Sequence, residues 1–133
     1  MNFLIAYIAA TIVFLAADAI WLGVIMKDAF QNGLGHLLAD KPNLGVAAGF
    51  YIMYVVGIVF FATMPAVKQN DWMMAALYGA LFGFFCYATY EMTNLATLKD
   101  WPVKTAIADM AWGAFLSGLT ATAGYFAVMF FNR

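Results

Sequence analysis

Charged side chains are scarce in this sequence of 133 residues: Lys, Arg, Asp and Glu together make up 10% of it. Soluble domains carry about 25%, so this chain has too few charges to cover a surface that faces water. Cysteine occurs once, as Cys86, which excludes a secreted scaffold held by disulfides. The formal net charge is -1 and no basic cluster is present, which excludes nucleic acid as a partner.

Apolar residues dominate what is present. They amount to 66% of the chain and include 13 Phe, 9 Met and 4 Trp. This content excludes intrinsic disorder, because the chain has ample apolar surface to bury. We therefore expect an integral membrane protein whose main partner is the lipid bilayer.

Four uninterrupted apolar stretches are long enough to cross a membrane, which needs about 20 residues. They cover residues 3–26, 44–67, 72–97 and 103–131, and the third becomes more polar after Tyr90. None of them alternates at a period of two residues, which excludes a β-barrel. We predict an all-α fold, a single bundle of four transmembrane helices over residues 1–133.

The first stretch could be mistaken for a cleaved signal peptide, because Ala16-Ala17 is similar to a cleavage site. No basic segment precedes it, and apolar residues continue past the two alanines to the length of a span. We expect this segment to be retained as the first transmembrane helix.

The connection between the first two spans, residues 27–43, is longer than the others. Its apolar residues follow the spacing of one helical face: Phe30, Leu34, Leu37 and Leu38. This spacing predicts a short amphipathic segment at the membrane interface, with an ordinary loop as the alternative. His36 also lies here, and we expect a solvated loop residue. We assign no metal ligands, although an oxygen-ligated magnesium or manganese ion that used His36 with carboxylates remains an alternative.

Basic residues near the span ends indicate the orientation. The first and third connections hold Lys27, Lys41, Lys99 and Lys104, whereas the opposite side holds Lys68 and Arg133. The positive-inside rule then places the two Lys-rich connections in the cytoplasm and both termini on the outer side of the membrane.

Three acidic residues lie within the spans, where an Asp costs about 2.5–3.5 kcal/mol. They are Asp18, Glu91 and Asp109. Asp18 lies eight residues before Met26 and Asp109 six residues after Val103, so they are about 12 Å and about 9 Å from the same membrane surface. Glu91 approaches that surface too, because it lies late in the third span. We predict that antiparallel packing brings the three acids together near one leaflet.

Three ionised carboxylates in one apolar pocket would repel one another and lose their hydration. The spans offer no basic side chain at that depth, so we expect protonation of some carboxyls, a bound cation or a water-filled cavity. Two alternatives are purely structural. Glu91 could emerge into solvent at the end of a long third helix, and Asp18 and Asp109 could hydrogen-bond one helix to another.

Polar and aromatic neighbours extend this predicted site. Asp18 and Asp109 each precede a tryptophan by three residues, Trp21 and Trp112, which places indole and carboxyl on one helical face. Indoles can donate to a carboxylate or hold a cation, although Trp also favours membrane interfaces in general. The third span adds a stripe to the binding set, with Tyr87 and Asn94 on the same helical face as Glu91 and Tyr90 beside that face. Tyr51 and Tyr54 could join it or be ordinary span aromatics.

Other features are explained by packing. Three small-residue faces allow helices to approach closely: Gly45 with Gly49, Gly79 with Gly83, and the series Gly113, Ser117, Thr120 and Gly124. Pro65 lies near the end of the second span, where a helix break costs little. Cys86 is a free thiol that burial would make inert.

Two groups of residues carry a resemblance to a known family. One is the stretch Tyr87-Ala88-Thr89-Tyr90-Glu91-Met92-Thr93-Asn94-Leu95-Ala96-Thr97-Leu98 followed by Trp101-Pro102, Asp109 and Trp112-Gly113; the other is Asp18-x-x-Trp21-Leu22 with Phe50-Tyr51. Over essentially its whole length the chain resembles the bacterial membrane proteins catalogued as domain of unknown function 2177. The resemblance implies a multi-pass helical protein of the bacterial inner membrane, whose termini would then be periplasmic. The resemblance supplies no activity, cofactor or site. At position 91 we expect Asp in members of this family at least as often as the Glu found here.

We expect the acid-lined site to bind or translocate a small cationic or polar solute, with carboxylate protonation as the switch. One alternative is an enzyme, or enzyme subunit, that acts on lipid headgroups through two carboxylates. Another is a non-catalytic accessory subunit of a larger membrane complex. A chain this short favours a homodimer or a larger assembly for transport, and the sequence indicates no cofactor.

Overall fold

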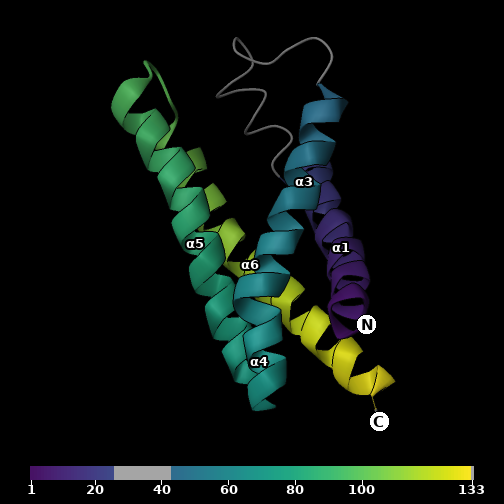
Figure 1. The fold of residues 1–133 in the computed structure, drawn as a ribbon. Coiled ribbons are helices and arrows are strands. Elements are labelled where there is room, and N and C mark those ends of the chain that lie inside the picture. The colour runs from purple at the N-terminus through teal and green to yellow at the C-terminus, as the bar shows by residue number, and fades with distance from the viewer. Residues whose placement is uncertain (26–42, 133) are drawn as a thin grey trace.

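A computed structural model describes residues 1–25 and 43–132 (Figure 1). In this part of the chain four helices are long and apolar enough to cross a membrane: Asn2–Val24, Leu44–Gln69, Trp72–Thr97 and Val103–Phe131. This confirms the predicted helical membrane fold. The interfacial segment expected within residues 27–43, with His36, Lys27 and Lys41, lies outside the described residues.

The four spans contain seven helical elements in the described part of the chain. In order, they are α1 (Asn2–Ile20), η1 (Trp21–Ile25), α3 (Leu44–Ile58), η3 (Val59–Thr63), α4 (Met64–Gln69), α5 (Trp72–Thr97) and α6 (Val103–Phe131). The π-helical segment η1 continues α1, and the π-helical segment η3 joins α3 to α4. The third and fourth spans have the predicted bounds, whereas the second extends to Gln69.

Pro65 accounts for the wide turns of η3. Proline lacks an N–H, and its ring collides with the carbonyl four residues earlier, which here belongs to Phe61 within η3. A π-helical turn relieves such a collision without ending the helix. The second span is therefore continuous across the proline, where the sequence indicated a cheap break.

Two side chains define the tight connection between α4 and α5. Asn70 ends α4 in the left-handed conformation, with φ 53°, which asparagine tolerates at a helix C-terminus. Asp71 then caps α5, and its Oδ1 accepts a hydrogen bond of 3.0 Å from the Met73 N–H. The two helices are forced to run antiparallel.

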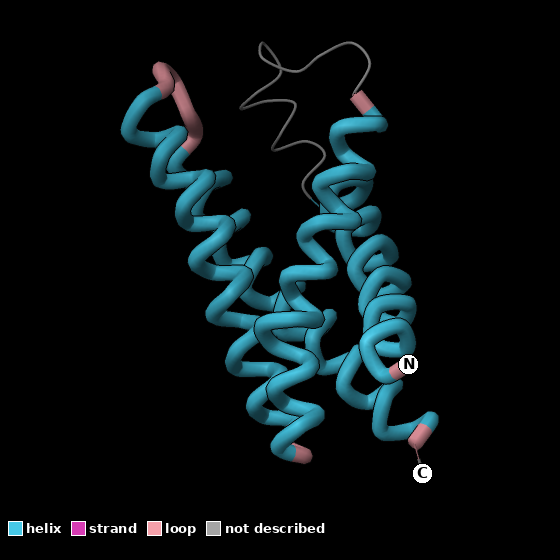
Figure 2. The backbone as a smooth tube through the Cα atoms, in the orientation of Figure 1, coloured by secondary structure: helices cyan, strands magenta, loops and turns pink. Residues whose placement is uncertain are grey.

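Helices α5 and α6 lie side by side and form one half of the molecule, and α1 packs on α6 beside α3 (Figure 1). Helix α3 diverges from α5 toward the end of the bundle that bears the third connection. The two termini lie together at the other end, where Asn132 Nδ2 donates to Asn2 Oδ1 at 2.9 Å. Figure 2 shows how little of the described chain is loop.

Two of the three small-residue faces pack as predicted. A Cβ on Gly79 would lie 2.7 Å from both the Ala121 Cβ and the Ser117 carbonyl oxygen, and one on Gly83 would overlap the Gly113 carbonyl oxygen. These contacts hold the backbones of α5 and α6 together. The third face was predicted wrongly, because a Cβ on Gly49 would meet nothing within 4 Å.

Candidate functional site

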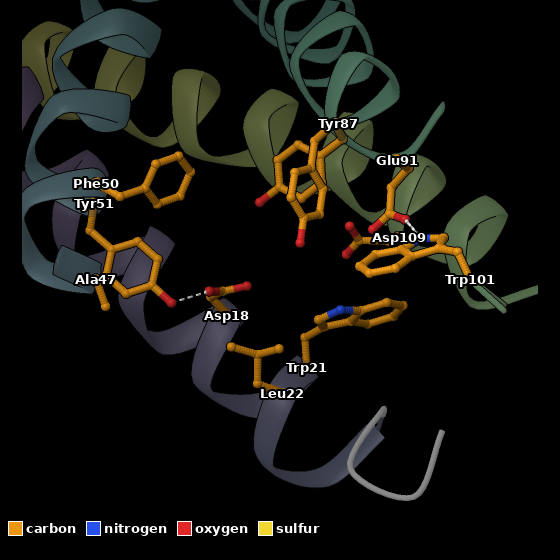
Figure 3. Close-up of a pocket in the computed structure, with 11 residues that line it drawn as sticks. Asp18, Trp21, Leu22, Ala47, Phe50, Tyr51, Tyr87, Glu91, Trp101 and Asp109 are labelled. Carbon is orange, nitrogen blue, oxygen red and sulfur yellow. Dashed lines mark hydrogen bonds between the residues drawn. The ribbon is translucent and has the colours of Figure 1, made fainter. Parts of the chain in front are cut away.

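A cavity of about 240 Å³ opens among all four spans, and we call it the acid pocket (Figure 3). Helix α1 and segment η1 provide one wall, α3 a second, and α5, α6 and their connection the remainder. Its lining consists of Asp18, Trp21, Leu22, Ala47, Phe50, Tyr51, Tyr87, Tyr90, Glu91, Trp101 and Asp109. The three intramembrane acids, about 70 and 90 residues apart in the chain, therefore border one cavity.

Asp18 is buried, with 7% of its surface exposed, and two other helices supply its partners. The Tyr51 hydroxyl on α3 donates to Asp18 Oδ2 at 2.8 Å, and the Trp112 indole on α6 donates to Oδ1 at 3.4 Å. The first bond has the usual length of an O–H···O hydrogen bond, whereas the second is at the long limit for an N–H donor. Tyr51 is therefore the main support of this carboxyl.

Glu91 is even more enclosed, with 2% of its surface exposed. Its Oε2 accepts a hydrogen bond of 2.7 Å from Trp101 Nε1. Trp101 reaches it because the connection between α5 and α6 reverses at Asp100, which has a φ of 61°. This burial contradicts the alternative in which Glu91 emerges into solvent at the end of a long helix.

Asp109 lies beside Glu91 at the wall of the pocket, on the neighbouring helix α6. Figure 3 shows the two carboxyl groups pointing toward each other, with Asp18 across the cavity. The structure therefore places two carboxyls side by side between α5 and α6.

The tryptophans do not pair with the acids along each helix, as the repeated Asp-x-x-Trp spacing predicts. Trp112 of α6 donates to Asp18 of α1, whereas the buried Trp21 Nε1 has no hydrogen-bond partner among the described residues. The two indoles stack with centroids 4.5 Å apart and planes at 2°. Local helical spacing placed the right residues together but could not indicate which helix each indole faces.

The remaining predicted residues surround this arrangement. Tyr87 lies against Gly113, where any Cβ would overlap its ring, so the glycine makes room for the tyrosine. Tyr90 packs edge-on against Trp101 with centroids 6.1 Å apart. Asn94 and Trp112 do not line the cavity themselves.

Several lining residues were not in the predicted site. Tyr51 was an open alternative, and Trp101 was noticed only in the family motif. Leu22, Ala47 and Phe50 complete the set. Trp101 had one available signal: an indole placed between two spans, directly before a proline, on the side of the membrane where the acids lie.

The three acids form two separate groups around the cavity: Asp18 on one side, and Glu91 with Asp109 on the other. No group of three His, Cys, Asp or Glu side chains among the described residues is close enough to hold a metal ion. The described spans carry basic residues only near their ends, at Lys68 and Lys104. What the pocket offers is a set of hydrogen-bond acceptors, fixed by aromatic donors, at the depth of one leaflet.

Comparisons with known proteins agree with this fold. A family model described as "Predicted membrane protein (DUF2177)" matches residues 3–126. The chain belongs to this family. The match spans all four helices, so the multi-pass membrane location applies to the whole bundle and includes every residue of the acid pocket. Searches among curated proteins and among solved structures each gave no match.

Proposed function

We propose that this membrane protein binds a positively charged or hydrogen-bond-donating group in the acid pocket, with proton exchange on its carboxyls as the switch. The observation that carries the proposal is the convergence of Asp18, Glu91 and Asp109 on one cavity. An intramembrane acid is costly, so three acids around one cavity favour a ligand that offsets that cost. The aromatic walls suit a cation, which the faces of Trp and Tyr rings attract.

The Glu91–Asp109 pair supports the switch. When a cationic group enters, its charge favours the ionised form of these two carboxyls, and when either carboxyl takes up a proton, the cation loses that partner. The titratable groups that face this pair are Asp18 from α1 and the tyrosines Tyr51, Tyr87 and Tyr90 from α3 and α5. Binding of a cation would therefore be linked to proton release.

Binding is better supported than passage through the bundle. Beyond the pocket the core is filled by fully buried side chains, among them Phe14, Ile58 and Leu116. Translocation would require the helices to separate there.

The site is proposed to face the cytoplasmic leaflet of a bacterial inner membrane, with periplasmic termini. The support is the excess of lysine in the first and third connections. The acid pocket lies at the end of the bundle where α5 and α6 are joined, since Trp101 of the third connection lines it.

Binding of butylamine, a small protonated amine, to the purified protein tests the proposal. Trp21 and Trp101 line the pocket and Trp112 stacks on Trp21, so tryptophan fluorescence reports on the occupancy of the pocket. We expect a saturable change that weakens about tenfold in Asp18→Asn and Asp109→Asn, because each loses a charged acceptor. Asp71→Asn is the matched control, since asparagine caps a helix as well as aspartate. Equal titrations in all four proteins would contradict the proposal.

A second candidate function is acid–base catalysis on a lipid headgroup, and the Glu91–Asp109 pair favours it. Two adjacent carboxyls can give and take a proton in turn. The test is the lipid composition of cells from which the gene for this protein has been deleted. Catalysis is supported if the deletion changes that composition, the intact chain restores it and the Glu91→Gln variant does not.

A further inference from the structure

A second cavity, of about 760 Å³, lies between α3 and α5, and we call it the α3–α5 groove. Its walls are mainly apolar, with Val46 and Met53 from α3 and Phe82 and Cys86 from α5. Figure 1 shows why the space exists: α3 and α5 meet near η3 and diverge toward the end of the third connection.

The groove and the acid pocket adjoin each other. Phe50, Tyr87, Tyr90 and Asp109 line both cavities. Asp109 therefore lies where the two cavities meet, with Glu91 on the side of the acid pocket and the apolar α3–α5 groove on the other side. The combined space has a polar end rich in carboxyls and a long apolar end.

The groove faces the bilayer. Val46 and Met53 are each 68% exposed and Tyr90 is 57% exposed, and in a membrane protein these surfaces contact hydrocarbon. A polar group that borders hydrocarbon must find its partner within the protein or on a ligand. An ordinary lipid chain would fill the groove yet leave the carboxyl at its end without a donor.

We propose that the ligand of the acid pocket is a single-chain membrane amphiphile with a positively charged amine head, which enters from the bilayer and lays its chain in the α3–α5 groove. This inference rests on the proposed function, because it assigns the class of ligand that the same site binds. A groove of this size is within the range of about 300–1,000 Å³ for sites of small ligands, which suits one chain.

Charge selects the head. Among the residues that the structure describes, the lining of the acid pocket includes three acidic side chains and no lysine or arginine, so these acids would repel a phosphate head. An ammonium group attracts the carboxyls and donates hydrogen bonds to them, and the neighbouring indole and phenol rings favour a cation.

Photolabelling tests the inference. The probe is hexadecylamine with a photoreactive diazirine in its chain, added to the purified protein in non-ionic detergent, and labelled residues are located by mass spectrometry. Unlabelled competitors separate head from chain: hexadecylamine has both, butylamine keeps the head, hexadecanol keeps the chain, and hexadecyl phosphate reverses the charge.

We expect labels on the α3 and α5 residues that line the groove. Hexadecylamine should compete for them, and butylamine should compete at least about tenfold less well. Hexadecanol and hexadecyl phosphate should not compete at the same concentration. Met53→Trp, which fills the groove, should lower labelling about tenfold, whereas Met73→Trp should not, because Met73 is similarly exposed at 61% and lies outside the groove.

Different failures have different meanings. If butylamine competes as well as hexadecylamine, or Met53→Trp labels normally, the chain does not occupy the groove and only the proposed cation site survives. If hexadecanol competes equally, the groove accepts any lipid chain and the inference is overturned. If neither amine competes and Asp109→Asn labels like the native protein, both the inference and the proposed function fail. Label in cross-linked dimers would instead assign the groove to a second copy of the chain.

Discussion

Asp18 shows how a single intramembrane carboxyl is stabilised by residues that are distant in the sequence. Its stronger partner is Tyr51 at 2.8 Å and its weaker one is Trp112 at 3.4 Å. The difference in length implies a difference in energy, because hydrogen bonds weaken as they lengthen beyond about 3.2 Å. The tyrosine on α3 should therefore matter more to this acid than the tryptophan.

At this scale we predict that Tyr51→Phe lowers the free energy of unfolding by about 1–3 kcal/mol, the usual cost of leaving a buried acceptor such as Asp18 Oδ2 without its hydrogen bond. Trp112→Phe should lower the free energy of unfolding by less, because the hydrogen bond that it removes is long at 3.4 Å. The phenylalanine ring can still stack on Trp21. Unfolding in mixed detergent micelles measures both. The control is Tyr78→Phe, because Tyr78 is 42% exposed, and a Tyr51→Phe protein as stable as this control would contradict the assignment.

Helices α5 and α6 form the rigid element on which the site is built. Glu91 and Asp109 lie on these two helices, and the distance between their carboxyls is set by how closely the two backbones approach. Gly79 and Gly83 allow that approach by having no side chain where α6 passes. The close approach of α5 and α6 therefore determines both the stability of this pair of helices and the positions of the two acids.

At the scale of the element we predict that Gly83→Ala destabilises the protein by about 1–3 kcal/mol, the cost of overpacking a tight contact. The new methyl would overlap the backbone of Gly113 and the Ser117 side chain, so the helices must separate. Gly49→Ala is the matched control, since its methyl would meet nothing within 4 Å. Equal stability of the two variants in detergent unfolding would show that the predicted close contact is absent.

The bundle as a whole has its termini at one end (Figure 1). The acid pocket lies toward the other end, where Trp101 of the connection between α5 and α6 lines it. This arrangement follows from four spans joined in antiparallel order by short turns, such as the one at Asn70 and Asp71. The leaflet that holds the site is therefore fixed once the side of either terminus is known.

At the scale of the molecule we predict opposite labelling of two introduced cysteines. In a Cys86→Ala background, a membrane-impermeant maleimide added to intact spheroplasts should modify Asn132→Cys and not Asp100→Cys. Permeabilised membranes should label both. The reverse labelling pattern would show that the acid pocket faces the outer leaflet. Labelling of both positions in intact spheroplasts would contradict the four-span fold.

The sequence predicted the spans well because hydrocarbon leaves a backbone no alternative to helix formation. The predicted bounds of the third and fourth spans, residues 72–97 and 103–131, are the bounds observed. Pro65 was less predictable, because a proline can either end a helix or widen it, and the packing of η3 among its neighbours decides which.

The convergence of three acids could also be inferred from the sequence, because residue depth along a helix is a matter of counting. Their partners could not. Asp18 pairs with the indole of α6, not with the one three residues ahead of it, and Trp101 folds back from a connection to Glu91. These contacts depend on the rotation of one helix against another, which no local spacing encodes.

The scarcity of charge determined by itself that this chain belongs in a membrane and that its few buried acids are exceptional. Tertiary structure alone decided that the acids form two groups around one cavity, and that this cavity adjoins an apolar groove. The physical reason is that insertion into lipid depends on each segment separately. A binding site depends on the space that remains when segments of fixed shape pack together.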